Sequence, residues 1–233
     1  MDVYEAVASR RAVRAFTDEP VPHAALDRVL AAAARSPAGG NLQPWHLYVL
    51  TGAPLAELKK RTAERAEAGD PGDERQYRMY PPEPKSPYRE RRSAAAARRF
   101  AALGIRREDS EARRAAVAAN WRCFGAPCLL LCYLDRAMGE AQWADLGMYL
   151  QTVMLLLRAE GLHSCAQMAW SVYHRTVADV VTPPEELVLF AGLSIGFEDP
   201  SAPFAPIDRA LLAETVTFLG GSAGSGRGQP ASP

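Results

Sequence analysis

The sequence has 233 residues, and its 27 Lys and Arg side chains balance 27 Asp and Glu side chains. A chain of this length can bury a sizeable core in one domain, and its zero net charge gives no overall field that attracts nucleic acid or an anionic membrane. We therefore expect neither partner, and any anion must be bound locally. The N-terminus lacks the basic and apolar regions of a signal peptide, so a cytoplasmic protein is expected.

The cysteines do not indicate a metal site. Cys123, Cys128, Cys132 and Cys165 form no C-x-x-C pair and have no histidine at zinc-ligand spacing. Three of them lie in apolar runs, which favours reduced core residues over a reactive thiol.

The first third of the chain is expected to hold helices at 2–10 and 23–35, both with amphipathic spacing. Proline and paired glycines then break the chain at 36–41. Residues 45–50 alternate as a strand does, and residues 54–67 have a helical pattern.

Residues 69–92 differ from their surroundings. They contain five prolines, three tyrosines and many charges, and no helix or strand of any length fits there. An ordered loop this long is usually functional, so we predict a lid or partner arm. The alternative is a disordered linker, but such linkers are poor in aromatic residues.

Helical patterns return at 94–103 and 110–122. The apolar run at 128–134 is typical of a strand buried on both faces. The longest helix is expected at 142–160, with one strongly apolar face and a second apolar set beside it, so it should be central and mostly buried. The remaining expected elements are strands at 163–168 and 187–195, a short helix at 173–180 and a disordered tail at 220–233.

Strands separated by helices predict an α+β or α/β fold. We expect one domain over 1–219, with a mixed central sheet flanked by helices.

Three arginines near the N-terminus are the first candidate site. Arg10, Arg11 and Arg14 fall within five residues. A guanidinium offers a rigid fork of donors that fits phosphate, and two or three of them match the charge of one phosphate monoester. The alternative is that they are solvated side chains at the C-terminal end of the first helix.

The second candidate is the loop Pro37-Ala38-Gly39-Gly40-Asn41-Leu42-Gln43-Pro44-Trp45. Its glycines allow close approach of backbone to a ligand, and its two amide side chains suit a polyhydroxylated chain or a heterocycle edge. A plain loop with an Asx turn is the alternative. Arg209 near the C-terminus could close on the same anion as the first three arginines.

The usual nucleotide and hydrolase motifs are missing from the sequence: there is no G-x-G-x-x-G after a strand, no P-loop, no H-E-x-x-H and no G-x-S-x-G. The four histidines are scattered, which gives little support to acid–base or metal hydrolysis. Redox chemistry on a bound cofactor requires only binding, orientation and electrostatics from the protein.

Taken in order, these stretches resemble the FMN-dependent nitroreductase superfamily, from residue 2 to about 220. The segments that are similar to its nitrobenzoate reductase-like branch are Leu103-Gly-Ile-x-Arg-Glu-Asp109, Asn120-Trp-x-x-Phe-Gly-Ala-Pro127, Trp143-x-Asp-Leu-Gly-Met-x-Leu-Gln151 and Ile195-Gly-Phe-x-Asp-Pro200.

The resemblance implies a nitroreductase-like α+β fold and an intertwined homodimer with FMN at the subunit interface. Carried over by position, the implied cofactor contacts are Arg10, Arg11, Ala12, Arg14, Pro37, Ala38, Asn41, Gln43, Ala166, Gln167, Met168 and Arg209. Arg10 and Arg11 would bind the phosphate and Arg14 the flavin side, while residues 166–168 would present backbone N–H to flavin N5. Tyr77, Tyr80 and Tyr88 would border the substrate pocket.

The implied reaction is ping-pong reduction of a nitroaromatic, quinone or other electron-poor acceptor by NADPH or NADH through FMN, without a catalytic side chain. Two alternatives stay open. One is a same-fold flavin enzyme with different chemistry, such as a tailoring dehydrogenase or oxidase or a reductive dehalogenase. The other is a flavin-binding protein without turnover.

Overall fold

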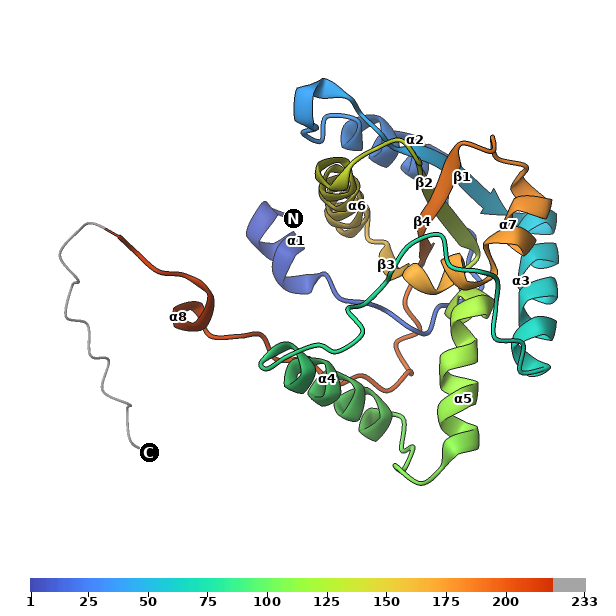
Figure 1. Cartoon of the computed structure of the whole chain (residues 1–233), viewed down its shortest axis with the longest axis vertical. Coiled ribbons are helices and arrows are strands. Elements are labelled where there is room, and N and C mark those ends of the chain that lie inside the picture. Colours follow the sequence, from blue (N-terminus) through green and yellow to red (C-terminus); the bar gives the residue numbers. More distant parts are fainter. Residues whose placement is uncertain (220–233) are drawn as a thin grey trace.

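The computed structural model describes residues 1–219, and the expected tail at 220–233 lies outside them. A four-stranded sheet lies between two groups of helices (Figure 1). Its strands, in spatial order, are β1 (His46–Thr51), β2 (Cys128–Asp135), β4 (Leu187–Gly196) and β3 (His163–Gln167). The predicted α+β class is confirmed.

The sheet is antiparallel where a mixed one was expected, since all three neighbouring pairs run in opposite directions. The long helix α6 (Glu140–Ala159) does return the chain so that β3 runs parallel to β2. However, β4 is inserted between these two strands and reverses the direction at both contacts. In the described part of the chain, parallel pairing outside the strands is limited to one bridge between Ala12 and Ser164.

Strand β2 is buried on both faces, as predicted, and it separates two cores. Leu130 and Leu134 contribute to the core beneath α2 (His23–Ala33) and α6. Leu129 and Leu131 contribute to the core beneath α3 (Gly52–Glu67) and α7 (His174–Val181). This division follows from the alternation of side chains along a strand. The structure is therefore a three-layer sandwich, with helices on both faces of the sheet (Figure 1).

Helix α6 is the expected central helix. Its buried residues recur at helical spacing and comprise Asp145, Leu146, Tyr149, Leu150, Val153 and Leu157. Gly161, with a φ of 78°, follows the helix and lets the chain turn sharply into β3.

Helix α1 (Val3–Ser9) is short and lies on the surface, with Ala6 as its buried residue. It begins with a capping box in which Asp2 and Glu5 each bond the other's backbone N–H. Val3, Tyr4 and Val7 are exposed. The helix stops at Arg10, where the chain becomes extended.

Two predicted boundaries differ from the structure by more than two residues. Helix α4 (Tyr88–Ala102) begins inside the segment predicted to be irregular, because Pro87 precedes it and Glu90 lies in its first turn. Helix α5 (Ser110–Ala118) is shorter than the predicted 110–122 and continues as the 3₁₀ segment η2 (Ala119–Gly125). There Cys123 and Phe124 adopt left-handed backbone with a φ of 53°, which ends regular helix.

All four cysteines are free and buried. Burial raises the pKa of the thiols of Cys123, Cys128 and Cys132 to about 12, so they stay protonated near neutral pH.

The described C-terminal arm, residues 199–219, crosses α4 and then leaves the body of the molecule (Figure 1). Arg98 pairs with Asp208, and Arg91 pairs with Glu214 of the short helix α8 (Leu212–Thr215). Among the helices of residues 1–219, none is both long and apolar enough to cross a membrane.

Candidate functional site

The three N-terminal arginines lie on an extended segment that runs along the outer edge of β3. The Val13 N–H donates to the Ser164 carbonyl at 3.1 Å, and the Phe16 N–H donates to the Phe124 carbonyl at 3.1 Å. Val13 and Phe16 are buried and anchor the segment in the core. The arginines between and before them are thereby held at the edge of the sheet.

Arg11 is engaged within the protein. Its guanidinium pairs with the Glu198 carboxylate and lies 3.7 Å from the centroid of the Phe204 ring. By contrast, Arg10 and Arg14 have no carboxylate partner among residues 1–219. The charge of Arg11 is thus compensated within the protein, whereas the charges of Arg10 and Arg14 are not.

Arg158 and His163 also lie near Glu198. Arg158 of α6 donates to the Leu162 carbonyl at 2.8 Å and to Ser9 Oγ at 3.3 Å. His163 Nε2 lies 3.4 Å from the Glu198 carboxylate. Burial, followed by repulsion from Arg158 and Arg11, lowers the pKa of His163 to about 4, so the imidazole is neutral and this contact is not an ion pair.

Arg99 was not singled out by the sequence and belongs to the same region. Its Nη2 donates to the Ala116 carbonyl at 2.8 Å, while its Nε is buried with no partner in the described structure. Burial lowers the pKa of Arg99, and the nearby Arg14 lowers it further. Arg99 is one of five arginines in α4, so its position in the sequence gave no signal.

The end of β3 presents backbone groups at the same edge. In an antiparallel strand, alternate residues direct N–H and C=O to the same side. Because the Ser164 carbonyl faces the arginine segment, the N–H of Ala166 faces this edge too. Ala166 is exposed, whereas the side chain of Gln167 is buried and Met168 packs partly against the α2 and α6 core.

The loop at 37–45 is held by α6 at a place different from that of the arginine segment. The N–H of Gly39 lies 3.1 and 3.3 Å from the carboxylate oxygens of the buried Asp145. Asn41 and Gln43 are exposed and left-handed, with φ of 59° and 49°, and Gln43 Nε2 donates to the Asn41 carbonyl at 3.1 Å. Pro37 is exposed and Ala38 half-buried.

Within one chain, the two predicted contact regions lie far apart. Asp145 holds the loop near the start of α6, while Arg158 contacts Ser9 near the end of the helix. These anchors are thirteen positions apart in the helix, which corresponds to about 20 Å along the axis.

The three predicted substrate tyrosines have different surroundings. Tyr77 is half-buried, donates to the Phe190 carbonyl and packs against Trp143 with ring centroids 5.0 Å apart. Tyr80 is exposed beneath the guanidinium of Arg92, and Tyr88 is exposed at the start of α4.

Arg209 lies on the C-terminal arm, where its guanidinium donates to the carbonyls of Ile207 and Asp208. In the described structure it makes no contact with Arg10, Arg11 or Arg14.

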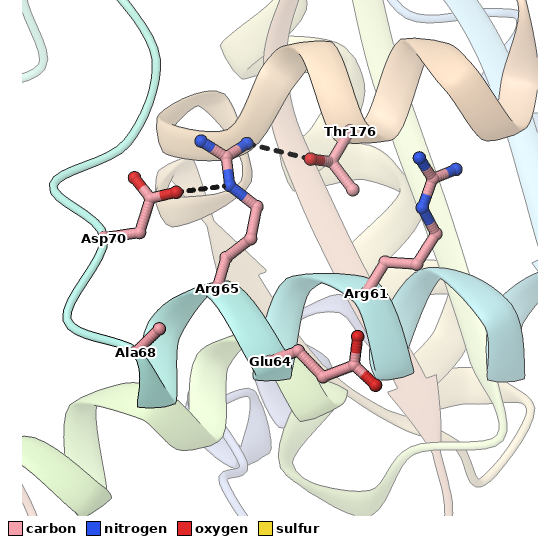
Figure 2. A pocket seen from close by; sticks show the side chains of 6 residues that line it. All are labelled: Arg61, Glu64, Arg65, Ala68, Asp70 and Thr176. Atoms are coloured by element: carbon pink, nitrogen blue, oxygen red, sulfur yellow. Dashed lines mark hydrogen bonds and ion pairs between the residues drawn. The ribbon is translucent and has the colours of Figure 1, made fainter.

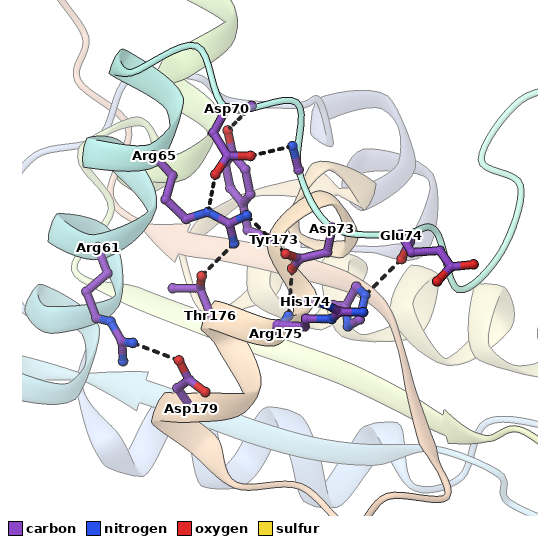
Figure 3. Close-up of polar contacts among 11 residues, drawn as sticks. Arg61, Arg65, Asp70, Asp73, Glu74, Tyr173, His174, Arg175, Thr176 and Asp179 are labelled. Carbon is purple, nitrogen blue, oxygen red and sulfur yellow. Dashed lines mark hydrogen bonds and ion pairs between the residues drawn. The ribbon is translucent and has the colours of Figure 1, made fainter.

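The first part of the predicted lid, residues 70–77, is held against α3 and α7 by ion pairs and hydrogen bonds, and we call this segment the strap. Figure 3 shows its ion pairs and hydrogen bonds to α3 and α7. Arg65 lies 2.7 Å from Asp70 and 3.0 Å from Asp73, and it donates to Thr176 Oγ1 at 2.8 Å. The second Asp73 oxygen accepts the Arg175 N–H at 2.9 Å.

A shallow cavity of about 400 Å³ lies beside this strap (Figure 2). Arg61, Glu64 and Arg65 line it from α3. Since Asp70 and Asp73 neutralise Arg65, the cavity lacks the uncompensated charge that would mark an anion site.

Arg10 and Arg14 thus place uncompensated positive charge beside the outer edge of β3 in an α+β fold. The model of the Nitroreductase family matches residues 7–197, and the chain belongs to this family.

Characterised relatives cover nearly the whole chain. A nitrobenzene nitroreductase from Ectopseudomonas oleovorans is 32% identical over 215 residues, which span 91% of this chain and 95% of that protein. A 4-nitrobenzoate reductase from Nocardioides sp. (strain LMS-CY) is 32% identical over 222 residues, which span 91% and 88% of the two chains.

Solved structures share the fold. The FMN and NADPH-dependent nitroreductase NfnB from sphigopyxis sp. strain HMH is 42% identical, with a TM-score of 0.91 over 94% of this chain and 100% of that one. The FMN-dependent nitroreductase NfnB from Mycobacterium smegmatis, solved in complex with NADPH, is 30% identical, with a TM-score of 0.86 over the same shares.

Proposed function

We propose that the protein is an FMN-dependent oxidoreductase that uses NADPH or NADH to reduce nitroaromatic and other electron-poor compounds. Its relatives are named for nitrobenzene and 4-nitrobenzoate reduction, and its structural neighbours for FMN and NADPH. The observation in this chain that carries the proposal is the pair of uncompensated arginines, Arg10 and Arg14, at the edge of β3.

The residues at this edge fit FMN. A phosphate monoester carries about −1.5 to −2 charges at neutral pH, which requires at least two nearby cations. Arg10 supplies one and Arg11, which also pairs with Glu198, the other, while Arg14 is left for the flavin side. The Ala166 N–H faces the same edge.

When bound, FMN supplies the chemistry by accepting a hydride from a nicotinamide and passing electrons to the acceptor. The protein binds the phosphate and orients the ring. Arg14, with Arg99 beside it, adds positive charge that favours the negative charge that develops on the flavin during reduction.

We infer that a second copy of the chain completes the site. The loop with Asn41 and Gln43 lies about 20 Å along α6 from the arginine segment, so one chain does not bring both to one ligand. Exposed apolar side chains on α1 and the C-terminal arm provide a surface for the second copy to cover; they include Val3, Tyr4, Leu211, Leu212, Phe218 and Leu219. In this arrangement, Arg209 reaches the phosphate only through the exchange of arms.

The substrate side of the proposal now rests on Tyr80 and Tyr88. Both are exposed on the chain that leads into α4. Tyr77 packs within the strap, and its hydroxyl donates to the Phe190 carbonyl.

The test begins with the purified protein, mixed with FMN and followed by flavin fluorescence. We expect Arg10→Ala to weaken FMN binding about 10- to 100-fold, the effect of losing charge-assisted hydrogen bonds to phosphate. Arg107→Ala, an exposed arginine elsewhere on the surface, is the matched control and should leave binding unchanged.

Anaerobic mixing of the FMN-loaded protein with NADPH or NADH should bleach the flavin absorbance, and added 4-nitrobenzoate should restore it. A protein that binds no FMN, or one whose flavin neither donor reduces, would contradict the proposal.

A further inference from the structure

We propose that Gln167 is a positioning residue whose buried side chain fixes the end of β3, so that the backbone of 166–168 keeps its orientation toward the flavin. This inference rests on the proposed function. Gln167 is 3% exposed, although it belongs to a short strand at the edge of the sheet.

Both ends of the Gln167 amide are hydrogen-bonded, and their partners belong to three different elements. Its Oε1 accepts from the Ser194 hydroxyl of β4 and from Trp170 Nε1 of η3 (Met168–Tyr173) at 3.3 Å. Its Nε2 donates to the Asn120 carbonyl of η2 at 2.8 Å and to Asn120 Oδ1 at 3.3 Å. The side chain therefore ties β4, η2 and η3 to the residue at the end of β3.

The partners also determine which way the amide points. Trp Nε1 only donates and a backbone carbonyl only accepts, so the two ends of the amide are not interchangeable. A side chain of the same size without these groups would fill the space, but it would leave the Asn120 carbonyl and the Ser194 hydroxyl without their partner.

The opposite strand is adapted to this network. Gly192 is the residue that pairs with Gln167 across the sheet. A Cβ at Gly192 would lie 2.3 Å from Trp170 Cδ1, so the missing side chain is what lets the indole lie against β4 and reach Gln167. Two further bonds hold the chain that follows: Trp121 Nε1 donates to the Ala169 carbonyl at 3.3 Å, and Ser171 Oγ to the Met168 carbonyl at 2.8 Å.

The end of β3 requires such support because its outer side is uncovered there. The arginine segment bridges β3 at Ser164 and diverges afterwards. Ala166, two residues on, has β4 on one side and the proposed flavin site on the other. Its backbone orientation therefore depends on how the next residue is held.

The experiment compares Gln167→Met with Thr176→Val, which removes a half-buried hydrogen bond between Arg65 of α3 and α7. Dissociation constants of oxidised FMN, together with the midpoint potential of the bound flavin, are measured for both. For Gln167→Met we expect oxidised FMN to bind about tenfold more weakly relative to reduced FMN, because an N–H donor to the oxidised ring is lost. This change raises the potential by about 30 mV. Thr176→Val should lower stability without changing the potential.

Ser194→Ala removes one hydrogen bond to the Gln167 amide and leaves the Gln167 side chain itself unchanged. This variant tests the inference if Gln167→Met does not fold. We expect a smaller rise in potential. An unchanged potential in the folded variant would overturn the inference, as would equal weakening of oxidised and reduced FMN, which marks a merely structural role. Failure of the wild-type protein to bind FMN would instead contradict the proposed function.

Discussion

Neighbouring arginines in the N-terminal segment have separate tasks. Arg11 is held by Glu198 and Phe204, while Arg14 is exposed and has no carboxylate partner within residues 1–219. Sequence spacing alone grouped them as one cluster. Their environments make them distinguishable in experiment.

We expect Arg14→Ala to make bound FMN harder to reduce, because a cation near the pyrimidine favours the reduced flavin and its loss lowers the midpoint potential. Arg11→Ala should change the potential little and mainly lower stability, since it leaves the Glu198 carboxylate without its partner. Spectroelectrochemical titration of both variants checks this, and an unchanged potential for Arg14→Ala would refute it.

His163 gives the molecule a specific response to acid. Its folded pKa of about 4 lies below the value near 6.5 of an unfolded histidine, because it is buried and faces Arg158 and Arg11. The unfolded chain therefore binds the proton first. The stabilising contribution is complete above pH 6.5 and is lost as the pH falls toward 4.

Urea unfolding at pH 7, 5 and 4 measures this dependence. We expect His163→Gln to lose less of its free energy of unfolding between pH 7 and 5 than the wild-type protein does. Superimposable pH profiles would show that His163 does not contribute.

At the scale of elements, the strap at 70–77 is fastened by Arg65 of α3 (Figure 3). We expect Arg65→Ala to reduce the free energy of unfolding by about 2 kcal/mol, because Asp73 is buried and would lose its cation. Arg61→Ala, one turn earlier, breaks only an exposed pair with Asp179 and should cost about 0.5 kcal/mol or less. Equal effects of the two variants in urea unfolding would contradict the role of the strap.

Helices and strands were predictable where the local pattern of apolar residues shows which side chains are buried. The continuous apolar run of β2 and the apolar faces of α6 required no knowledge of partners, and both were found as expected. The insertion of β4 between β2 and β3 was not predictable, because it depends on pairing between residues far apart in the chain.

Within the candidate site, the sequence identified the arginine segment but not its internal division. The pairing of Arg11 with Glu198 joins residues 187 positions apart, and no local pattern marks it. Gln167 was expected to act through its backbone, whereas its side chain is bound to three other elements. The ion pairs that hold the strap could not be predicted, because Arg65 and Asp73 look like solvated charges in the sequence, whereas the Asp73 side chain is buried.

The whole molecule is proposed to act as two copies. We expect the wild-type protein to sediment as a dimer and Leu212→Asp to weaken the association more than tenfold, since Leu212 is exposed on the arm and a charge would have to be desolvated at the interface. Leu103→Asp, an exposed leucine at the end of α4, is the control. A monomeric wild-type protein that binds FMN fully would contradict the shared site.

The arginine segment can make its contacts with the rest of the fold only late in synthesis. Arg11 through Phe16 are among the first residues made, yet their partners are Ser164 and Glu198. In a nascent chain, the residues proposed to bind phosphate therefore stay undocked until β4 and Glu198 have left the ribosome, and such long-range contacts form late in folding. We therefore expect the proposed phosphate contacts to form only after Ser164 and Glu198 have been made.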